Sequence, residues 1–293
     1  MVETLLIIIE QALLHFPLIL GAYISISLMK TPDLGLDSAY VFGAFCAGLL
    51  LPYTQNMPFI ISFPLIIAAS LLGGACVGTV SSMLTQKARI PHLLSSLTTI
   101  GIFHGVIQFI AGVYLSLSGY TNMLECDIIP LHPDLPILTI IFILCTLTAI
   151  YFFKTELGYC LAVFGVNPYF FSHYKIATSY VFISGIISAN ALAGLSGYLF
   201  AQSNGFADIN MGFGKLLLCV TTLILGKIGQ NNKPLSILIP IFGTFSYFTL
   251  QQLLLKVGFD LRYFTMVQAL VIVIILITQI RRNANLHIDH LGV

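Results

Sequence analysis

Apolar runs about as long as a lipid bilayer is thick fill most of this 293-residue chain. Only 8% of the residues are charged, and the mean hydropathy is +0.98. A hydrocarbon core of about 30 Å needs roughly 20 mostly apolar residues for each helical span. A water-soluble domain with 58% hydrophobic residues and so few charges would not stay dispersed. The sequence therefore predicts an all-α bundle of transmembrane helices that forms a single domain over residues 1–293.

Continuous apolar runs predict about nine membrane spans. The second run is short, so it is a candidate for a broken or partial helix. Residues 5–153 would form the first half of the domain, 154–174 a segment on the inner side, 175–280 the second half and 281–293 a polar tail. The expected spans are Leu5–Met29, Ser38–Pro52, Pro58–Leu84, Leu93–Leu117, Pro136–Phe153, Lys175–Ala201, Ile209–Gly226, Pro234–Leu255 and Leu261–Ile280.

Basic residues occur in every second break between these runs. Nine of the twelve Lys and Arg residues would lie on one side of the membrane. Cytoplasmic loops of membrane proteins are enriched in Lys and Arg. We therefore expect the N-terminus outside and the C-terminus in the cytoplasm. The residues that set this orientation are Lys30, Lys87, Arg89, Lys154, Lys175, Lys227, Lys233, Arg281 and Arg282.

Composition and motifs exclude several functions. A net charge of +1 gives no basic surface for nucleic acid. No G-x-x-x-x-G-K-[ST] phosphate loop is present, so any ATP must be hydrolysed by another chain. The six cysteines form no C-x-x-C pair, and we expect neither a metal nor a cofactor in this chain. No set of polar residues has the spacing of an intramembrane catalytic site.

Two of the breaks resemble each other. Thr31–Gly43 and Gly205–Leu217 each contain Gly and Asp and then continue into an apolar run, with Asp33 matched to Asp208. Five predicted spans separate them, and an odd number gives the two copies opposite orientations. In such inverted repeats, broken helices meet near the middle of the membrane and line a transport route. Two ordinary polar loops with a chance similarity are the alternative.

Charged residues within or beside membrane spans are costly, so each is a functional candidate. Asp33, Asp37 and Asp208 would fix the breaks by accepting backbone amide hydrogen bonds at a following helix start. A simple solvated helix cap is the alternative for each. Gly212 and Gly214 belong to the second break and to the same candidate route.

Further polar residues lie inside the predicted spans. Thr98 and Thr99 stand near the start of the fourth span and would line the central route. His104 and Gln108 share one helix face, where they either line that route or form an interhelical hydrogen bond. We expect Lys215 to extend toward a membrane interface.

The segment 154–174 is the longest polar stretch on the predicted inner side. Leu157, Leu161 and Phe164 recur at helical spacing, which predicts a short amphipathic helix. Gly165 and the pair Asn167-Pro168 would end it. The helix either docks into a groove of a partner through exposed aromatic side chains or lies flat at the membrane surface.

Four motifs resemble the branched-chain amino acid and ribose permease superfamily of ATP-binding-cassette importers. Thr155-Glu-Leu-Gly158 followed by Ala162-Val-Phe-Gly165-Val-Asn167-Pro168 is similar to the cytoplasmic segment T-x-x-G-x-x-x-R-A-x-G-x-N-P of that family, although Ala162-Val163 replaces its Arg-Ala. Ser188–Gly197 resembles its small-residue helix, and Gly205–Gly214 its G-x-A-D-x-x-x-G-x-G break. Thr31–Asp37 resembles the P-D-L-T-V-D-G break of a subgroup assigned to tryptophan- or tyrosine-type uptake, with Ser38 in place of the glycine.

The resemblance implies the passive half of a pump in the bacterial inner membrane. Two permease copies would pair as a homodimer around a central route, and an extracytoplasmic binding protein would deliver a small solute, an amino acid first of all. A cytosolic ATPase that binds ATP and Mg²⁺ would drive the pair and would receive segment 154–174 as a coupling helix. The coupling residues carried over are Thr155, Gly158, Phe164, Gly165, Asn167 and Pro168.

An ion-coupled secondary transporter is the main alternative, because such proteins also use inverted repeats and broken helices. It would move its solute without an ATPase. A nucleoside or a sugar remains open as the substrate of the permease, because a binding protein would select much of the specificity.

Overall fold

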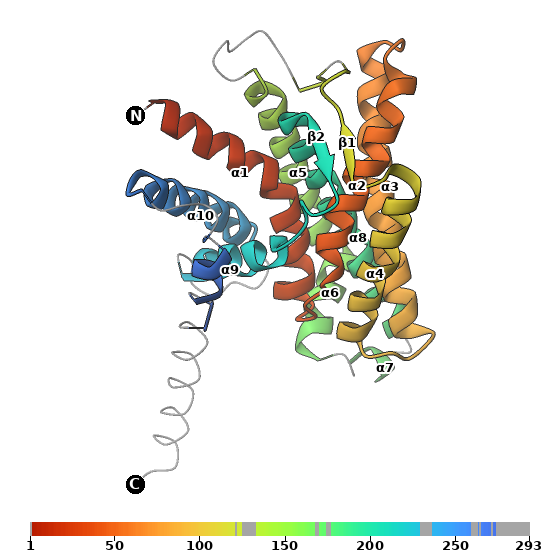
Figure 1. The fold of residues 1–293 in the computed structure, drawn as a ribbon. Coiled ribbons are helices and arrows are strands. Elements are labelled where there is room, and N and C mark those ends of the chain that lie inside the picture. Colours follow the sequence, from red (N-terminus) through yellow and green to blue (C-terminus); the bar gives the residue numbers. More distant parts are fainter. Residues whose placement is uncertain are drawn as a thin grey trace.

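The structure is a computed structural model that describes residues 2–120, 122–124, 133–167, 170–173, 177–228, 236–258, 263, 265–270 and 272–273. Helices account for most of these residues (Figure 1). The elements are α1 (Val2–Ala22), the π-helix η1 (Tyr23–Leu28), α2 (Gly35–Thr54), α3 (Phe59–Gln86), α4 (His92–Ala111), β1 (Tyr114–Ser116), α5 (Leu135–Lys154), α6 (Glu156–Val166), α7 (Phe170–His173), α8 (Thr178–Asn204), β2 (Phe206–Asp208), α9 (Lys215–Ile228) and α10 (Leu238–Lys256).

The predicted all-α polytopic bundle is confirmed. Within the described residues, 7 helices are long and apolar enough to cross a membrane. The second predicted span is a full 20-residue helix, α2, and not a partial one. The predicted span Ile209–Gly226 is too long, because residues 209–214 form turns and leave only the 14-residue helix α9. Most of the predicted span Leu261–Ile280 and all of 281–293 lie outside the described residues.

Helix α8 is central to the bundle and packs against α1, α2 and α3. The backbones approach closely where small residues face each other. A Cβ on Gly43 would collide with the backbone of Gly194, and one on Gly197 with the carbonyl of Tyr40. Lipid gives no hydrophobic drive for helices to associate, so such close packing stabilises the bundle.

The chain between α1 and α2 is irregular. Pro17 lies inside α1, and in Figure 1 the N-terminal half of this helix slants away from the upright helices. The helix then widens into η1, and Lys30 follows in the left-handed region with φ +53°. π-Helical turns occur frequently at functional sites. Residues 23–34 thus form an irregular connection, with a π-helix and a left-handed residue, between the regular helices α1 and α2.

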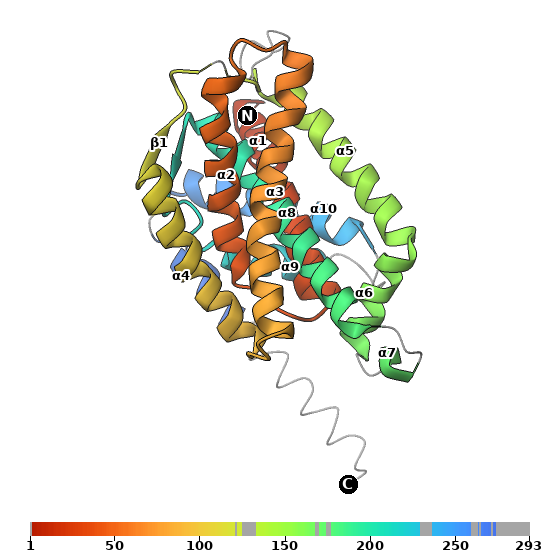
Figure 2. The same cartoon turned by 90° about the vertical axis from the view of Figure 1, so that its right-hand side faces the viewer.

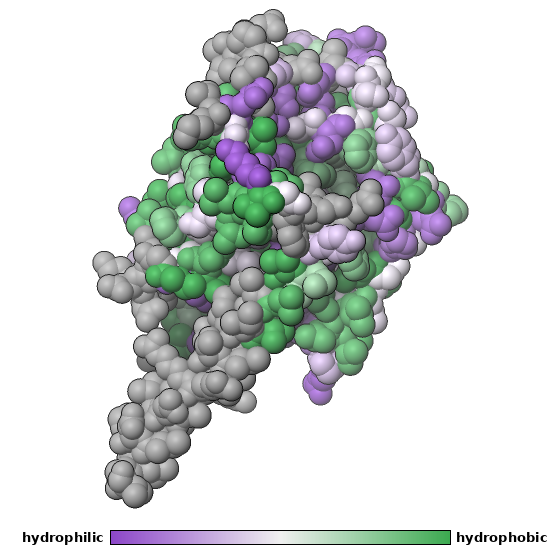
Figure 3. All heavy atoms as spheres, turned by 60° about the vertical axis from the view of Figure 1, so that its left-hand side comes forward, coloured by the Kyte–Doolittle hydropathy of each residue, from purple (hydrophilic) through white to green (hydrophobic). Residues whose placement is uncertain are grey.

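The two ends of the bundle differ in charge. Figure 2 places α6, α7 and the turn between α3 and α4 at one end, and the turn between α2 and α3 at the other. Lys87 and Arg89 lie in the α3–α4 turn, and Lys154 ends α5 directly before α6. These three basic residues thus lie at the end of the bundle that carries α6. On the face in Figure 3, apolar side chains cover the lower part and hydrophilic ones gather toward the top.

A short ribbon joins the loops that follow α4 and α8. Strand β1 pairs with β2 in antiparallel register, with Tyr114 opposite Asp208 and Ser116 opposite Phe206. The ribbon leads the chain from α8 into the second break and so helps to position residues 208–214.

Candidate functional site

The two breaks that resemble each other in sequence meet in the structure. The carboxylate oxygen Oδ1 of Asp37, in the first turn of α2, accepts a hydrogen bond of 2.7 Å from the amide of Leu216 at the start of α9. A Cβ on Gly212 would collide with the carbonyl of Asp37, so the second break lies directly on the first turn of α2. One helix therefore caps the other across 179 residues of sequence.

The matched residues Asp33 and Asp208 form the same local turn. The amide of Gly35 donates to Asp33 Oδ1 over 2.9 Å, and the amide of Asn210 donates to Asp208 Oδ1 over 2.6 Å. In both cases the carboxylate binds the amide two residues ahead, a pattern typical of aspartate in turns. The side chains differ in burial: Asp33 is fully buried and Asp208 is half-buried.

Asp33 accepts a further hydrogen bond from one distant helix and lies near a histidine of another. Asn190 Nδ2, in α8, donates to Asp33 Oδ2 over 2.7 Å and to the carbonyl of Ile186 over 2.9 Å. His92 Nε2, at the start of α4, lies 3.8 Å from Asp33 Oδ1. A buried carboxylate needs such partners, because taking it out of water is costly. The hydrogen bond from Asn190 therefore ties the first break to α8, and no sequence motif indicated this pairing.

A cavity of about 330 Å³ lies beside the junction of the two breaks. Asp37 and Gly212 contribute to its wall, and α4 contributes His104 among apolar residues. The structure thus places His104 at the wall of this cavity. The complete lining is Asp37, Ser38, Val41, Ile100, His104, Ile107, Ile209, Asn210, Gly212 and Phe213.

Other predicted route residues lie elsewhere. Thr98 and Thr99 do not line this cavity, and the hydroxyl groups of both donate to the carbonyl of Ser95 in the preceding turn of their own helix. Gly214 lies on the opposite side of the break, at the wall of a second cavity. Its φ of +80° is in the left-handed region, which glycine adopts without steric cost.

The predicted amphipathic helix is present as α6. Thr155 is its N-cap, and the amide of Gly158 donates to Thr155 Oγ1 over 3.5 Å. The helix ends at Val166, with the amide of Asn167 bonded to the carbonyl of Val163 over 2.9 Å. Pro168 lies outside the described residues.

The face of α6 that carries Phe164 and Gly165 points into the bundle. Phe164 is half-buried and packs against the rings of Phe171 and Phe182. A Cβ on Gly165 would collide with the carbonyl of Leu28, and one on Gly158 with the carbonyl of Phe152. These residues hold α6 against η1 and α5.

The exposed side of α6 carries different residues. Tyr159 is 54% exposed and Val166 is 77% exposed. They are seven residues apart, which places them on one helix face two turns from each other. Any partner that touches α6 from outside meets these two side chains before it meets Phe164.

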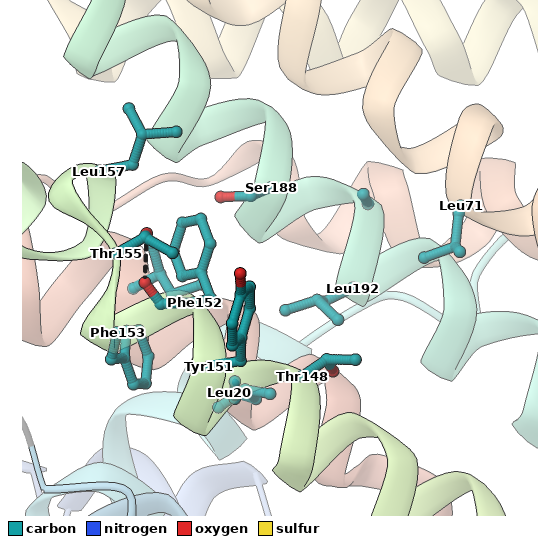
Figure 4. Close-up of a pocket in the computed structure, with 13 residues that line it drawn as sticks. Leu20, Leu71, Thr148, Tyr151, Phe152, Phe153, Thr155, Leu157, Ser188 and Leu192 are labelled. Atoms are coloured by element: carbon teal, nitrogen blue, oxygen red, sulfur yellow. Dashed lines mark hydrogen bonds between the residues drawn. The ribbon is translucent and has the colours of Figure 1, made fainter.

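A third space, an apolar groove of about 480 Å³, opens between α5 and α8. Figure 4 shows Tyr151, Phe152 and Leu192 around it, with the hydroxyl of Thr155 bonded to the carbonyl of Phe152 over 2.6 Å. Among the described residues that line this groove, none is charged. The groove suits a lipid chain better than a polar solute, and no residue of the two breaks, 31–43 and 205–217, lines it.

The comparisons with known proteins agree with this architecture. The model of a family described as the permease component of the branched-chain amino acid transport system matches residues 8–276. An uncharacterised protein of Rickettsia prowazekii is 30% identical over 259 residues, which are 86% of this chain and 89% of that protein. No solved structure gives a significant match.

Two relatives carry names that state a function. The tyrosine transport system permease protein of Clostridioides difficile is 28% identical over 221 residues, 75% of this chain and 71% of that protein. The autoinducer 2 import system permease protein LsrC of Escherichia coli is 25% identical over 229 residues, 78% of this chain and 64% of that protein. Both are membrane subunits of transporters and not enzymes. The family match over most of the chain and the multi-pass helical fold therefore show that this chain belongs to the branched-chain amino acid transport permease family of ATP-binding-cassette importers.

Proposed function

We propose that this chain imports a small solute of the amino acid class across the bacterial inner membrane, as the passive subunit of a pump. Two copies pair around a central route. A cytosolic ATPase holds ATP and Mg²⁺ and acts on the pair through α6, and an extracytoplasmic binding protein delivers the solute at the opposite end. The N-terminus is outside and the C-terminus is cytoplasmic.

The contact between the two breaks is the observation that carries this proposal. Irregular backbone survives at membrane depth only where protein or a water-filled cavity satisfies its amides. Here Asp37 satisfies the amide of Leu216, and the junction forms one wall of the 330 Å³ cavity. Because this wall is made of the first turns of two helices, a small shift of either helix can open or close the cavity. A single continuous helix could not open the cavity in this way.

Pairing of two copies is supported by one face of α4. Gly101 and Gly105 have nothing within 4 Å of where a side chain would start. The G-x-x-x-G spacing lets two membrane helices approach closely. His104, which lines the cavity, stands on the same face. Pairing through this face would place the cavities of both copies near a shared axis.

The choice of an amino acid follows from the name of the Clostridioides relative, a tyrosine transport permease. The LsrC relative, an autoinducer 2 import permease, shows that related chains take a different solute. A nucleoside or a sugar is therefore the second candidate substrate, and a transport assay must include both.

Reconstitution tests the proposal. Proteoliposomes would contain the chain with or without its co-purified ATPase, and uptake of labelled L-tyrosine, L-leucine, adenosine and ribose would be measured with a saturating binding protein. We expect uptake of one amino acid that requires both ATP and the ATPase. Uptake by the chain alone, driven by a sodium or proton gradient, would instead establish the secondary transporter.

A further inference from the structure

A second polar cavity, of about 490 Å³, lies on the other side of the second break. Helices α1, α8, α9 and α10 all contribute to its wall, and Phe213 is shared with the cavity beside Asp37. This space belongs to a single copy of the chain. Its polar lining residues are Gln11, His15, Asn204, Lys215, Tyr247, Gln251, Gln252, Thr265 and Gln268.

Lys215 supplies a positive charge to this cavity. Its ammonium Nζ lies 2.9 Å from His15 Nε2, and 4.9 Å and 4.4 Å from the ring centres of Tyr40 and Phe200. The prediction that this lysine extends to a membrane interface is therefore wrong. The side chain is instead held inside the bundle, over two aromatic rings.

The hydrogen bonds fix the protonation pattern of the neighbouring imidazole. His15 Nδ1 is 3.0 Å from the carbonyl of Gln11, which only accepts, so Nδ1 carries the proton. His15 Nε2 is then an acceptor and receives a hydrogen bond from the Lys215 ammonium. The ammonium has three N–H groups and uses one of them here.

Within the described residues, no carboxylate lies within 4.0 Å of the Lys215 ammonium. Asp37 acts on Lys215 electrostatically, but its Oδ1 is bonded to the amide of Leu216. Taking an ammonium out of water is costly unless it is paired and hydrogen-bonded. The cavity thus presents a cation that is only partly neutralised by the protein.

Other residues of the wall offer hydrogen-bond acceptors. The side-chain oxygens of Gln251 and Gln268 are buried and have no partner among the described residues. The Gln268 side chain is only 4% exposed, and its nitrogen Nε2 donates to the hydroxyl of Tyr247. Buried amide oxygens are normally hydrogen-bonded, so an unpartnered pair at the wall of a cavity points to a ligand that donates.

We infer that this cavity binds a small carboxylate inside one copy of the chain, with Lys215 as the counter-charge and the amides of Gln251 and Gln268 as acceptors for a donor group on the same molecule. The site is distinct from the proposed central route, because the turn 210–214 separates the two. It rests on the proposed function only for the choice of the probes below.

Equilibrium binding to the full chain tests this inference. The purified chain, in phosphatidylcholine nanodiscs without ATPase or ATP, is titrated with labelled L-tyrosine and L-leucine and with tyramine and isoamylamine, which lack only the carboxylate. We expect saturable binding of at least one amino acid and at least about 10-fold weaker binding of its amine, since the amine cannot accept a hydrogen bond from the Lys215 ammonium. Lys215→Met should abolish the difference and Lys215→Arg should retain it.

Control variants show whether binding depends on this cavity. Lys227→Met removes a lysine from the far end of the same helix and should leave binding unchanged, while thermal unfolding shows that each variant is folded. The inference is overturned if neither amino acid binds, if Lys215→Met binds as the native chain does, or if inorganic phosphate or phosphatidylglycerol displaces the ligand completely at equal concentration. ATP-driven uptake by the assembled complex is measured separately, so uptake without this binding would reject the cavity site and leave the proposed function intact.

Discussion

At the scale of single residues, Asp37 has the most specific role. Its carboxylate replaces the side chain that would normally cap α9 from within the same segment. Because the donor is a backbone amide, any side chain with an acceptor oxygen at this position can accept the same hydrogen bond. Charge and hydrogen bonding can therefore be separated by substitution.

We predict that Asp37→Ala lowers the stability of the chain by about 1–3 kcal/mol, because the buried amide of Leu216 loses its partner. Asp37→Asn should retain most of the stability and most of the ATP-driven uptake, since Asn and Asp are equally good helix caps. Thermal unfolding in detergent and uptake in proteoliposomes measure the two effects. If Asn is as defective as Ala in uptake, the negative charge and not the cap is what transport requires.

The sequence could reveal the local half of this site but not the distant half. The turns at Asp33 and Asp208 depend on an amide two residues away, so the pattern of residues encodes them. Asn190 is 157 residues from Asp33, and nothing in a single sequence pairs them. The prediction for Lys215 was wrong because the turns before it move the start of α9 into the bundle.

At the scale of elements, α6 and the irregular residues 23–34 form one connected path. Gly165 packs on the carbonyl of Leu28, and Met29 packs on Gly185 of α8. The chain then passes through Lys30 to Asp33 and into α2. A displacement of α6 would reach η1 and the first break without crossing a flexible loop.

Helical periodicity correctly predicted α6 but not which face is exposed. The apolar positions Leu161 and Phe164 have the spacing of a helix face, and a helix face of this kind can pack either on its own bundle or on a partner. In the structure Leu161 is fully buried, and Phe164 is half-buried against Phe182 of the same bundle. The same ambiguity affected Thr98 and Thr99, whose hydroxyl groups are satisfied by a carbonyl of the preceding turn.

Tyr159 is the α6 residue whose loss should affect the ATPase most directly. We predict that Tyr159→Ala reduces solute-stimulated ATP hydrolysis of the assembled complex several-fold, about the effect of removing a packed interface aromatic worth roughly 1–2 kcal/mol. Tyr151→Ala is a matched control, because Tyr151 is 75% exposed on α5 and lines the apolar groove between α5 and α8. Equal hydrolysis by the two variants would mean that the ATPase does not contact this face of α6.

At the scale of the whole molecule, orientation follows from where the basic turns lie. Lys87 and Arg89 share the end that carries α6, and the turn 55–57 at the other end has no charge. Positive charge keeps a loop in the cytoplasm. The orientation and the coupling proposal are thus linked: if α6 meets a cytosolic ATPase, the turn at Lys87 must be cytosolic too.

Cysteine accessibility tests this link. In a cysteine-free background, Asn56→Cys should react with a membrane-impermeant maleimide in right-side-out vesicles, and Ala88→Cys should react only in inside-out vesicles. Both positions are exposed turn residues. The reverse labelling pattern would invert the molecule and remove α6 from the reach of any cytosolic protein.

The pairing of two copies can be tested selectively on α4. Gly101→Leu adds a side chain to the proposed contact face at a position where a Cβ would meet no atom of another element within 4 Å. We predict that it shifts the chain from dimer to monomer in light scattering after detergent extraction and lowers uptake in proportion, while thermal unfolding of the monomer is unchanged. Leu144→Phe enlarges an exposed position of α5, where Leu144 is 59% exposed, and should leave the dimer intact. A Gly101→Leu chain that still elutes as a dimer would place the contact on another helix, and the cavity beside His104 would then face lipid and not a shared route.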